Sequence, residues 1–146
     1  MNGNFEQLAA YNRWANARLY EAALALSEGD YQRDAGVFFK SMSGTLNHLL
    51  ATDRNWMWRL TGVGEHYDRG DLVIHEDRRA LTAARADEDE RIFRYVASLD
   101  VRHYRGCIPT PPQRASRSNR DGAIFLLIFS IIRRTIAAKR MQFFPS

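Results

Sequence analysis

The sequence has little of what several protein classes need. Its 146 residues include one cysteine, Cys107, so a disulfide framework and a cysteine-based zinc site are both excluded. It contains no glycine-rich phosphate loop, no G-x-S-x-G and no H-E-x-x-H, which removes sequence support for those enzyme classes. The longest apolar run, residues 123–132, is too short to span a bilayer, and residues 1–14 do not resemble a signal peptide. We therefore expect a cytoplasmic protein with no membrane partner.

Excess positive charge is also missing from most of the chain. Residues 1–106 contain 14 Lys and Arg against 16 Asp and Glu, a balance of −2, whereas residues 107–146 contain 7 against 1, a balance of +6. The overall charge of +4 therefore comes from the tail. Because a basic surface for nucleic acid would rest on this tail alone, we expect no nucleic-acid partner.

The strongest helical pattern covers residues 41–62, where Leu46, Leu50 and Met57 recur at the spacing of a buried helix face. His48 lies in this run, on the side expected to face inward. A buried histidine commonly donates to a backbone or hydroxyl group, but imidazole on a rigid helix is also a good ligand for a divalent ion. Both interpretations stay open, because a single ligand makes no metal site.

Further helices are expected on either side of this one. Asn4, with Gln7 three residues later, resembles a capping box that opens a helix ending near Leu26. The apolar face of that helix is predicted to comprise Leu8, Ala15, Leu19, Ala22 and Leu26. Residues 27–30 are expected to break the helix, and residues 31–40, with Val37, Phe38 and Phe39, to form a packed connector.

The second half of the chain adds a crossover and two helices. Residues 63–76 are rich in glycine and mixed charge and predict a long surface crossover, followed by helices over residues 77–99 and 123–138. We predict a single domain over residues 1–146, an all-α, up-down four-helix bundle whose last helix is atypical.

Outside residues 41–62, charged and imidazole side chains are further candidates for a site. Asp89 follows Arg85 by one turn on the apolar face of its helix, which predicts a buried or site-lining ion pair. Asp87 and Glu90 are expected in solvent. The remaining histidines lack the four-residue spacing that lets two imidazoles share an ion, so each is expected at the surface: His66, His75 and His103.

Three stretches resemble a known family. YNRWANARLYEAALAL, GTLNHLLATDRNWMWRLTG and LTAARADEDERIFRYVASL are similar to DinB/YfiT-like proteins, over roughly residues 4–106. The resemblance implies a four-helix bundle, often dimeric, in which three histidines hold a divalent metal such as zinc or nickel. It also implies a metal-dependent hydrolase or thiol transferase acting on a small molecule. By this resemblance His48 is the first metal ligand, and no catalytic residue is indicated.

The tail departs from that pattern. The family's other two ligands form an H-x-x-x-H pair on the last helix, but no histidine follows His103, and composition changes abruptly near Gly106. If each codon of residues 128–139 is read one base earlier, ordinary codon choices give HLFNHQTHHRGQ. Two of these histidines replace Ile132 and Ile136, four apart and therefore on one helix face.

We infer a frameshift near residues 106–107, so that residues 1–106 are family-like and residues 107–146 are divergent. The family function is then a divalent-metal-dependent enzyme, inactive in this chain because two of three ligands are missing, with metal affinity weak or absent. The alternative is a metal-free helical scaffold or interaction protein, and a homodimer is compatible with either. A third function, binding of anionic membrane or nucleic acid, ranks lowest because it rests on tail residues alone: Arg133, Arg134, Lys139 and Arg140.

Overall fold

The structure is a computed structural model that describes residues 3–99 of the chain. Its helices are α1 (Gly3–Leu24), α2 (Glu28–Gln32), α3 (Met42–Thr61) and α4 (Arg78–Ala97). These residues contain no strand, only an isolated bridge between Val37 and Lys40. The described part is therefore all-α, as predicted, while the helix expected over residues 123–138 and the divergent tail lie outside the described residues.

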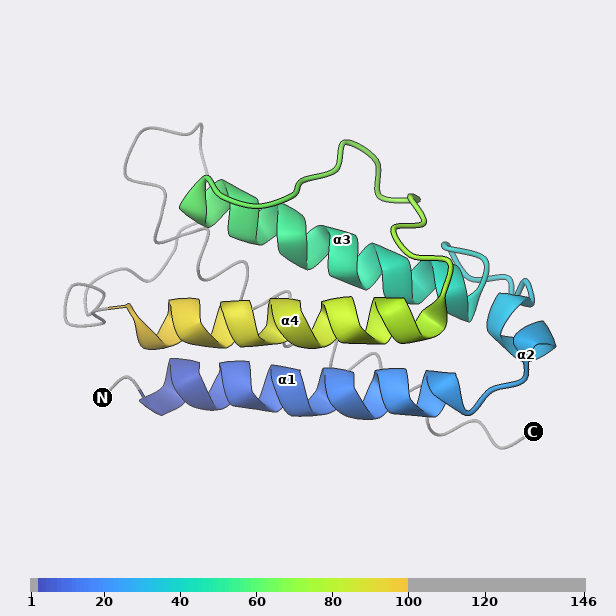
Figure 1. Cartoon of the computed structure of the whole chain (residues 1–146), viewed down its shortest axis with the longest axis horizontal. Helices are drawn as coiled ribbons and strands as arrows, with labels where there is room; N and C mark the ends of the chain where they lie inside the picture. The colour runs from blue at the N-terminus through green and yellow to red at the C-terminus, as the bar shows by residue number, and fades with distance from the viewer. Residues whose placement is uncertain (1–2, 100–146) are drawn as a thin grey trace.

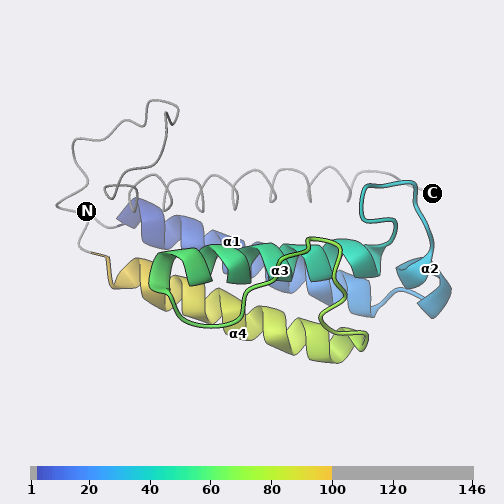
Figure 2. The same ribbon diagram turned by 90° about the horizontal axis from the view of Figure 1, so that it is seen from above.

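The three long helices lie side by side, and the short α2 sits at one end (Figures 1 and 2). Helix α1 runs in one direction, and α3 and α4 both run in the other, so the three long helices follow an up-down-down order and not the strict alternation of an up-down bundle. A connection between two helices that point the same way must return along their whole length. The predicted crossover does this, passing along α3 from the end of that helix to the start of α4.

Short side chains define the helix ends. Ser41 is the N-cap of α3, where its Oγ accepts a hydrogen bond from Gly44 N at 3.1 Å, and Asp77 caps α4 through Ala80 N at 2.7 Å. Gly62 ends α3 with a φ of 72°, a left-handed conformation that favours glycine. These ends lie within two residues of the predicted ones.

One local prediction about the first helix was wrong, because α1 begins at Gly3, so Asn4 lies inside it and is not its N-cap. The predicted break is confirmed, since α1 ends at Leu24. A short helix that was not predicted follows it: α2 begins at Glu28, where Ser27 Oγ accepts a hydrogen bond from Asp30 N.

The core consists of two apolar clusters at opposite ends of the helices. One contains Ala9, Met57, Ile92 and Val96. The other contains Tyr20, Ala23, Tyr31, Leu46, Leu50 and Leu81. Buried charged residues occupy the parts of α3 and α4 that lie, along the sequence, between the residues of the two clusters. Among residues 3–99, no helix is long and apolar enough to cross a membrane.

The buried face of α1 is turned relative to the predicted one. Its buried residues are Ala9, Asn12, Tyr20 and Ala23, whereas Ala22, expected inside, is exposed. Polar residues explain the difference, because Asn12 and Asn16 both donate hydrogen bonds to Asp89 of α4. Hydropathy alone does not predict that asparagine side chains are buried. The connector is also less packed than expected, because Phe38 is 92% exposed.

Candidate functional site

His48 lies in the first half of α3, half-buried between the connector that precedes the helix and the crossover that follows it. Its ring stacks on Phe39, with ring centroids 3.7 Å apart and planes 20° from parallel. Its Nδ1 lies 2.7 Å from the carbonyl oxygen of Gly70 in the crossover. The imidazole is thus fixed on one face by an aromatic ring and at one edge by backbone.

These contacts determine where the ring carries its proton. A carbonyl oxygen only accepts, so Nδ1 must be the donor to Gly70, and in the neutral ring Nε2 then holds a lone pair. Thr52 Oγ1 lies 3.3 Å from Nε2, but that hydroxyl is closer, at 2.8 Å, to the backbone carbonyl of His48. The hydroxyl has one proton to donate, and the shorter contact takes it. The Nε2 lone pair therefore has no strong donor among residues 3–99.

A half-open cavity of about 670 Å³ adjoins this histidine. It is lined by the connector, the first turns of α3 and the crossover, with His48, Phe39 and Gly70 among its residues. Lys40, which also lines it, has a φ of 65°, an uncommon conformation for a residue other than glycine. The cavity is large enough for a small molecule.

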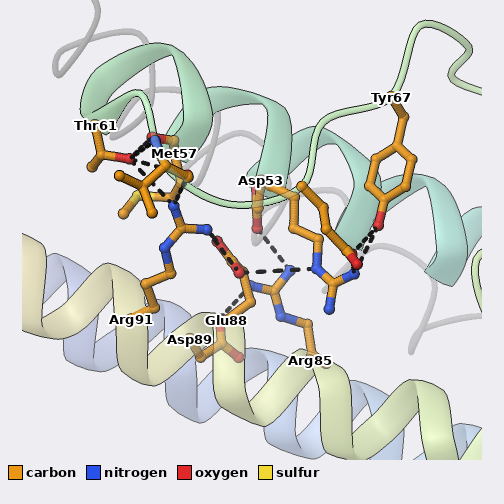
Figure 3. A network of polar contacts seen from close by, with 11 residues as sticks. Asp53, Met57, Thr61, Tyr67, Arg85, Glu88, Asp89 and Arg91 are labelled. Atoms are coloured by element: carbon orange, nitrogen blue, oxygen red, sulfur yellow. Dashed lines mark hydrogen bonds and ion pairs between the residues drawn. The ribbon is translucent and has the colours of Figure 1, made fainter.

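A second polar cluster lies deeper, between α1, α3 and α4. Arg85 donates from Nη1 to Asp53 Oδ2 and from Nη2 to Asp89 Oδ1, both at 2.8 Å, and all three side chains are at most 3% exposed. We call Asp53, Arg85 and Asp89 the buried charge layer. Figure 3 shows the guanidinium of Arg85 reaching from α4 between the two carboxylates. The predicted Arg85–Asp89 pair is therefore confirmed as a buried one, and Asp53 is its third member.

Helix α1 completes this layer. Asn12 Nδ2 and Asn16 Nδ2 donate to Asp89 Oδ1 at 3.2 and 2.9 Å, so three donors converge on one oxygen. Burial nevertheless raises the pKa of Asp89 to about 6, against the influence of Arg85 and Asn16, which favour the charged form. For Arg85, burial acts to lower the pKa, but the carboxylates of Asp53 and Asp89 outweigh it and the pKa is raised.

Glu88 extends the ionic contacts toward the crossover. It is 5% exposed and accepts from Arg91 Nη1 at 3.1 Å, and Arg91 in turn donates to the carbonyl of Val63 at 2.6 Å (Figure 3). Arg54 of α3 pairs with Glu65 and donates to Tyr67 Oη at 2.7 Å. Arginines of α3 and α4 therefore hold the first part of the crossover against the bundle.

The structure also places the other predicted residues. Asp87 is exposed and Glu90 is half-exposed, paired with Arg13 and Arg94, as expected for solvated carboxylates. His66 is at the surface, stacked on Trp58 with centroids 4.1 Å apart. His75 was expected there too, but it is half-buried and its Nε2 has no hydrogen-bond partner within residues 3–99. His103 lies outside the described residues.

The described residues do not fit a complete metal site. Searching residues 3–99 finds no group of three or more His, Cys, Asp or Glu side chains placed to hold an ion. His48 supplies one nitrogen without a strong donor, whereas Asp53 and Asp89 are paired with Arg85. The positions of Ile132 and Ile136 lie outside the described residues.

Sequence reasoning missed several polar residues. Residues of these types are mostly exposed in proteins, but four of them are buried or half-buried here: Asn12, Asn47, Asn55 and Glu88. A signal was present for one pair: Asn12 and Asn16 are four apart on the helix that faces Asp89, which is the spacing of one helix face. Asn47 is marked only as the neighbour of His48 in the stretch that carries the family resemblance, and no pattern marks Asn55; the partners of both are backbone atoms of the crossover.

Comparison with known proteins gives one match. A sequence model described as the DinB family matches residues 1–115 of the 146-residue chain. No curated protein and no solved structure matches the chain. Proteins of the matched family are generally metal-associated.

Proposed function

Because this chain belongs to the DinB family, we propose that it descends from a divalent-metal-dependent enzyme of the hydrolase or thiol-transferase type, with His48 as a metal ligand. The observation that carries this proposal is the contact between His48 Nδ1 and the Gly70 carbonyl. Histidines that bind metals usually donate their other ring N–H to a carbonyl or carboxylate in this way, which orients the free nitrogen toward the ion. The adjoining cavity would receive a small-molecule substrate.

We further propose that this chain itself binds zinc or nickel weakly or not at all and is inactive. One imidazole cannot close a site that needs about three protein ligands. The sequence has no histidine after His103, and the family match ends at residue 115, which leaves residues 116–146 without family support. Both facts favour the frameshift hypothesis, although the match extends nine residues beyond residue 106.

The alternative is a metal-free scaffold, and the buried charge layer favours it. Asp53 and Asp89 both pair with Arg85, and Asn12 of α1 donates to Asp89, so the layer joins all three long helices, although the buried Nε of Arg85 has no hydrogen-bond partner within residues 3–99. A bundle stabilised in this way can fold without metal, unlike domains whose folding depends on a bound ion. Homodimer formation and a cytoplasmic location stay predictions under either function.

Metal content tests the proposal. The 146-residue protein and a frame-corrected protein, restored to the shifted reading frame after Gly106, are incubated with zinc or nickel, desalted and analysed by plasma mass spectrometry. We expect about one ion per corrected chain, lost in His48→Ala and kept in His66→Ala, whose ring lies at the surface on Trp58. The uncorrected chain should retain little.

Two results would contradict this. Stoichiometric metal in the uncorrected chain that survives His48→Ala means that the ligand is wrongly assigned. If the corrected protein folds but binds no metal, the frameshift did not remove a metal site, and the metal-free scaffold is favoured.

A further inference from the structure

Asn47 binds the end of the crossover to α3. It is fully buried, and its Oδ1 accepts hydrogen bonds from Ile74 N at 2.8 Å and His75 N at 3.0 Å. Its Nδ2 donates to the carbonyl of His75 at 3.2 Å and to that of Ser43 at 3.0 Å. The amide thus uses two donors and two acceptor bonds, its full ordinary capacity, mostly on crossover backbone.

Asn55 binds the crossover a second time, eight residues further along α3. Its Nδ2 donates to the carbonyl of Tyr67 at 2.9 Å, and its Oδ1 accepts from Tyr67 N at 2.6 Å. A side-chain amide that pairs with both backbone groups of one residue fixes the position of that residue and also its orientation. The crossover is therefore bound to α3 at Tyr67 and again at residues 74–75.

Gly70 lies between these two attachments, three residues after Tyr67 and four before Ile74. A Cβ added to Gly70 would lie 3.3 Å from His48 Nδ1, closer than such contacts normally are, and 3.4 Å from Cε1. Glycine therefore permits the close approach that brings its carbonyl to 2.7 Å from Nδ1. The two asparagines hold the backbone on both sides of this contact.

We infer that Asn47, Asn55 and Gly70 are positioning residues for His48: they hold the Gly70 carbonyl where it keeps the imidazole in its Nδ1–H form, with the Nε2 lone pair free. None of them is a proposed metal ligand: Gly70 contacts His48 directly, and the two asparagines act through the crossover. The value of this arrangement for metal binding rests on the proposed function. The tautomer itself is a property of the metal-free chain and is measurable without that assumption.

The test is the tautomer of His48 in the metal-free 146-residue protein. Long-range ¹H–¹⁵N NMR at about pH 8.5, where imidazole is neutral, distinguishes a protonated from an unprotonated ring nitrogen. His48→Gln assigns the His48 signals by their loss. We expect Nδ1 to be protonated in the unmodified chain.

Variants then test the positioning. In Asn55→Ala and in Gly70→Ala we expect a shift toward Nε2–H, the tautomer that a free histidine side chain favours in water. Arg69→Ala is the matched control, because Arg69 precedes Gly70 but donates to Asp71 within the crossover, so the tautomer should not change. Circular dichroism checks that each variant is helical, and if Asn55→Ala unfolds, Gly70→Ala decides.

An unmodified chain with predominantly Nε2–H, or folded variants that keep Nδ1–H fully, would overturn the inference. The same variants in the frame-corrected protein separate it from the proposed function. If that protein binds metal, Asn55→Ala should weaken the affinity by about 10–100-fold, the usual effect of losing an outer-shell contact. If it binds none, the proposed function fails, while the tautomer result still decides the positioning role.

Discussion

Helix α3 contributes to two polar regions that differ in one respect. At Asp53 its side chain enters the buried charge layer, where both terminal nitrogens of Arg85 are hydrogen-bonded to carboxylates at 2.8 Å. At His48, five residues earlier, one ring nitrogen is hydrogen-bonded and the other keeps its lone pair beside a cavity. We call the first region closed, because its charged terminal groups are paired with one another, and the second open, because one nitrogen of His48 is uncommitted.

This difference separates structural polar groups from candidate functional ones. A buried charge that is committed to partners has little capacity left for a ligand, but removing one partner leaves the other uncompensated. Replacing a half-buried ring that has an uncommitted nitrogen should lower the free energy of unfolding only slightly. That nitrogen, however, is available to bind a ligand. If burial alone were used to find a functional site, the buried charge layer would be chosen before His48, although it is His48 that has an uncommitted nitrogen.

Arg85→Met should have the largest effect on stability. Asp53 and Asp89 would remain buried without their shared cation, which typically costs about 3–5 kcal/mol in the free energy of unfolding. Urea denaturation measures this, with Arg94→Met as the control, because its pair with Glu90 is largely exposed and such pairs contribute at most about 1 kcal/mol. A loss in Arg85→Met no larger than in the control would show that the layer is not closed.

The pH dependence of Asp89 gives the next largest effect. Burial raises its pKa from 3.8 to about 6, so the folded state binds the proton more tightly than the unfolded state. The contribution of this group is fully present below the unfolded pKa and is lost as pH rises through the folded one, a change of at most about 3 kcal/mol. Asp89→Asn removes this contribution.

We therefore expect the stability of the unmodified chain, relative to Asp89→Asn, to fall between about pH 4 and 6. Urea denaturation across that range measures it. Asp87→Asn is the control, because Asp87 is exposed on the same helix turn and should leave the pH profile unchanged. A relative stability that rises with pH would mean that Arg85 and the asparagines outweigh burial.

Gly44→Ala tests the packing around the open site. A Cβ at Gly44 would lie 2.2 Å from the carbonyl oxygen of Phe39, so the connector backbone must move. Overpacking costs about 1–3 kcal/mol, offset by about 1 kcal/mol from replacing glycine in a helix. We expect a net loss of about 1–2 kcal/mol, because Phe39 also stacks on His48. Gly29→Ala, whose Cβ would meet nothing closer than 3.9 Å, should not destabilise.

The sequence predicted helices better than it predicted their faces. Cap residues such as Ser41 and Asp77 and the left-handed Gly62 have local signals, and the helix ends lie close to the predicted ones. The predicted buried face of α1 was only partly right: Leu19 packs against the core, but hydropathy treats asparagine as a surface residue, whereas Asn12 is inside as a donor to Asp89. The four-residue spacing of Asn12 and Asn16 places them on one helix face, but it does not identify Asp89, 77 positions from Asn12, as their partner.

The candidate site was predictable in part. The resemblance indicates His48, and helical spacing placed Asp89 beside Arg85. The contribution of Gly70 was not predictable, because it depends on where a backbone carbonyl of an irregular crossover lies. That position follows from Asn47 and Asn55, whose partners are main-chain atoms that carry no sequence identity.

His48→Asn should have the smallest effect on stability and completes the comparison. The asparagine amide nitrogen can occupy nearly the same place as Nδ1 and donate to Gly70, and its helix propensity is close to that of histidine. What remains is the lost stacking on Phe39, about 1 kcal/mol, measured by urea denaturation beside Arg85→Met. A loss of 3 kcal/mol or more, as large as that expected for Arg85→Met, would favour His48 as a core histidine held for structure, since an open functional position has no reason to contribute so much.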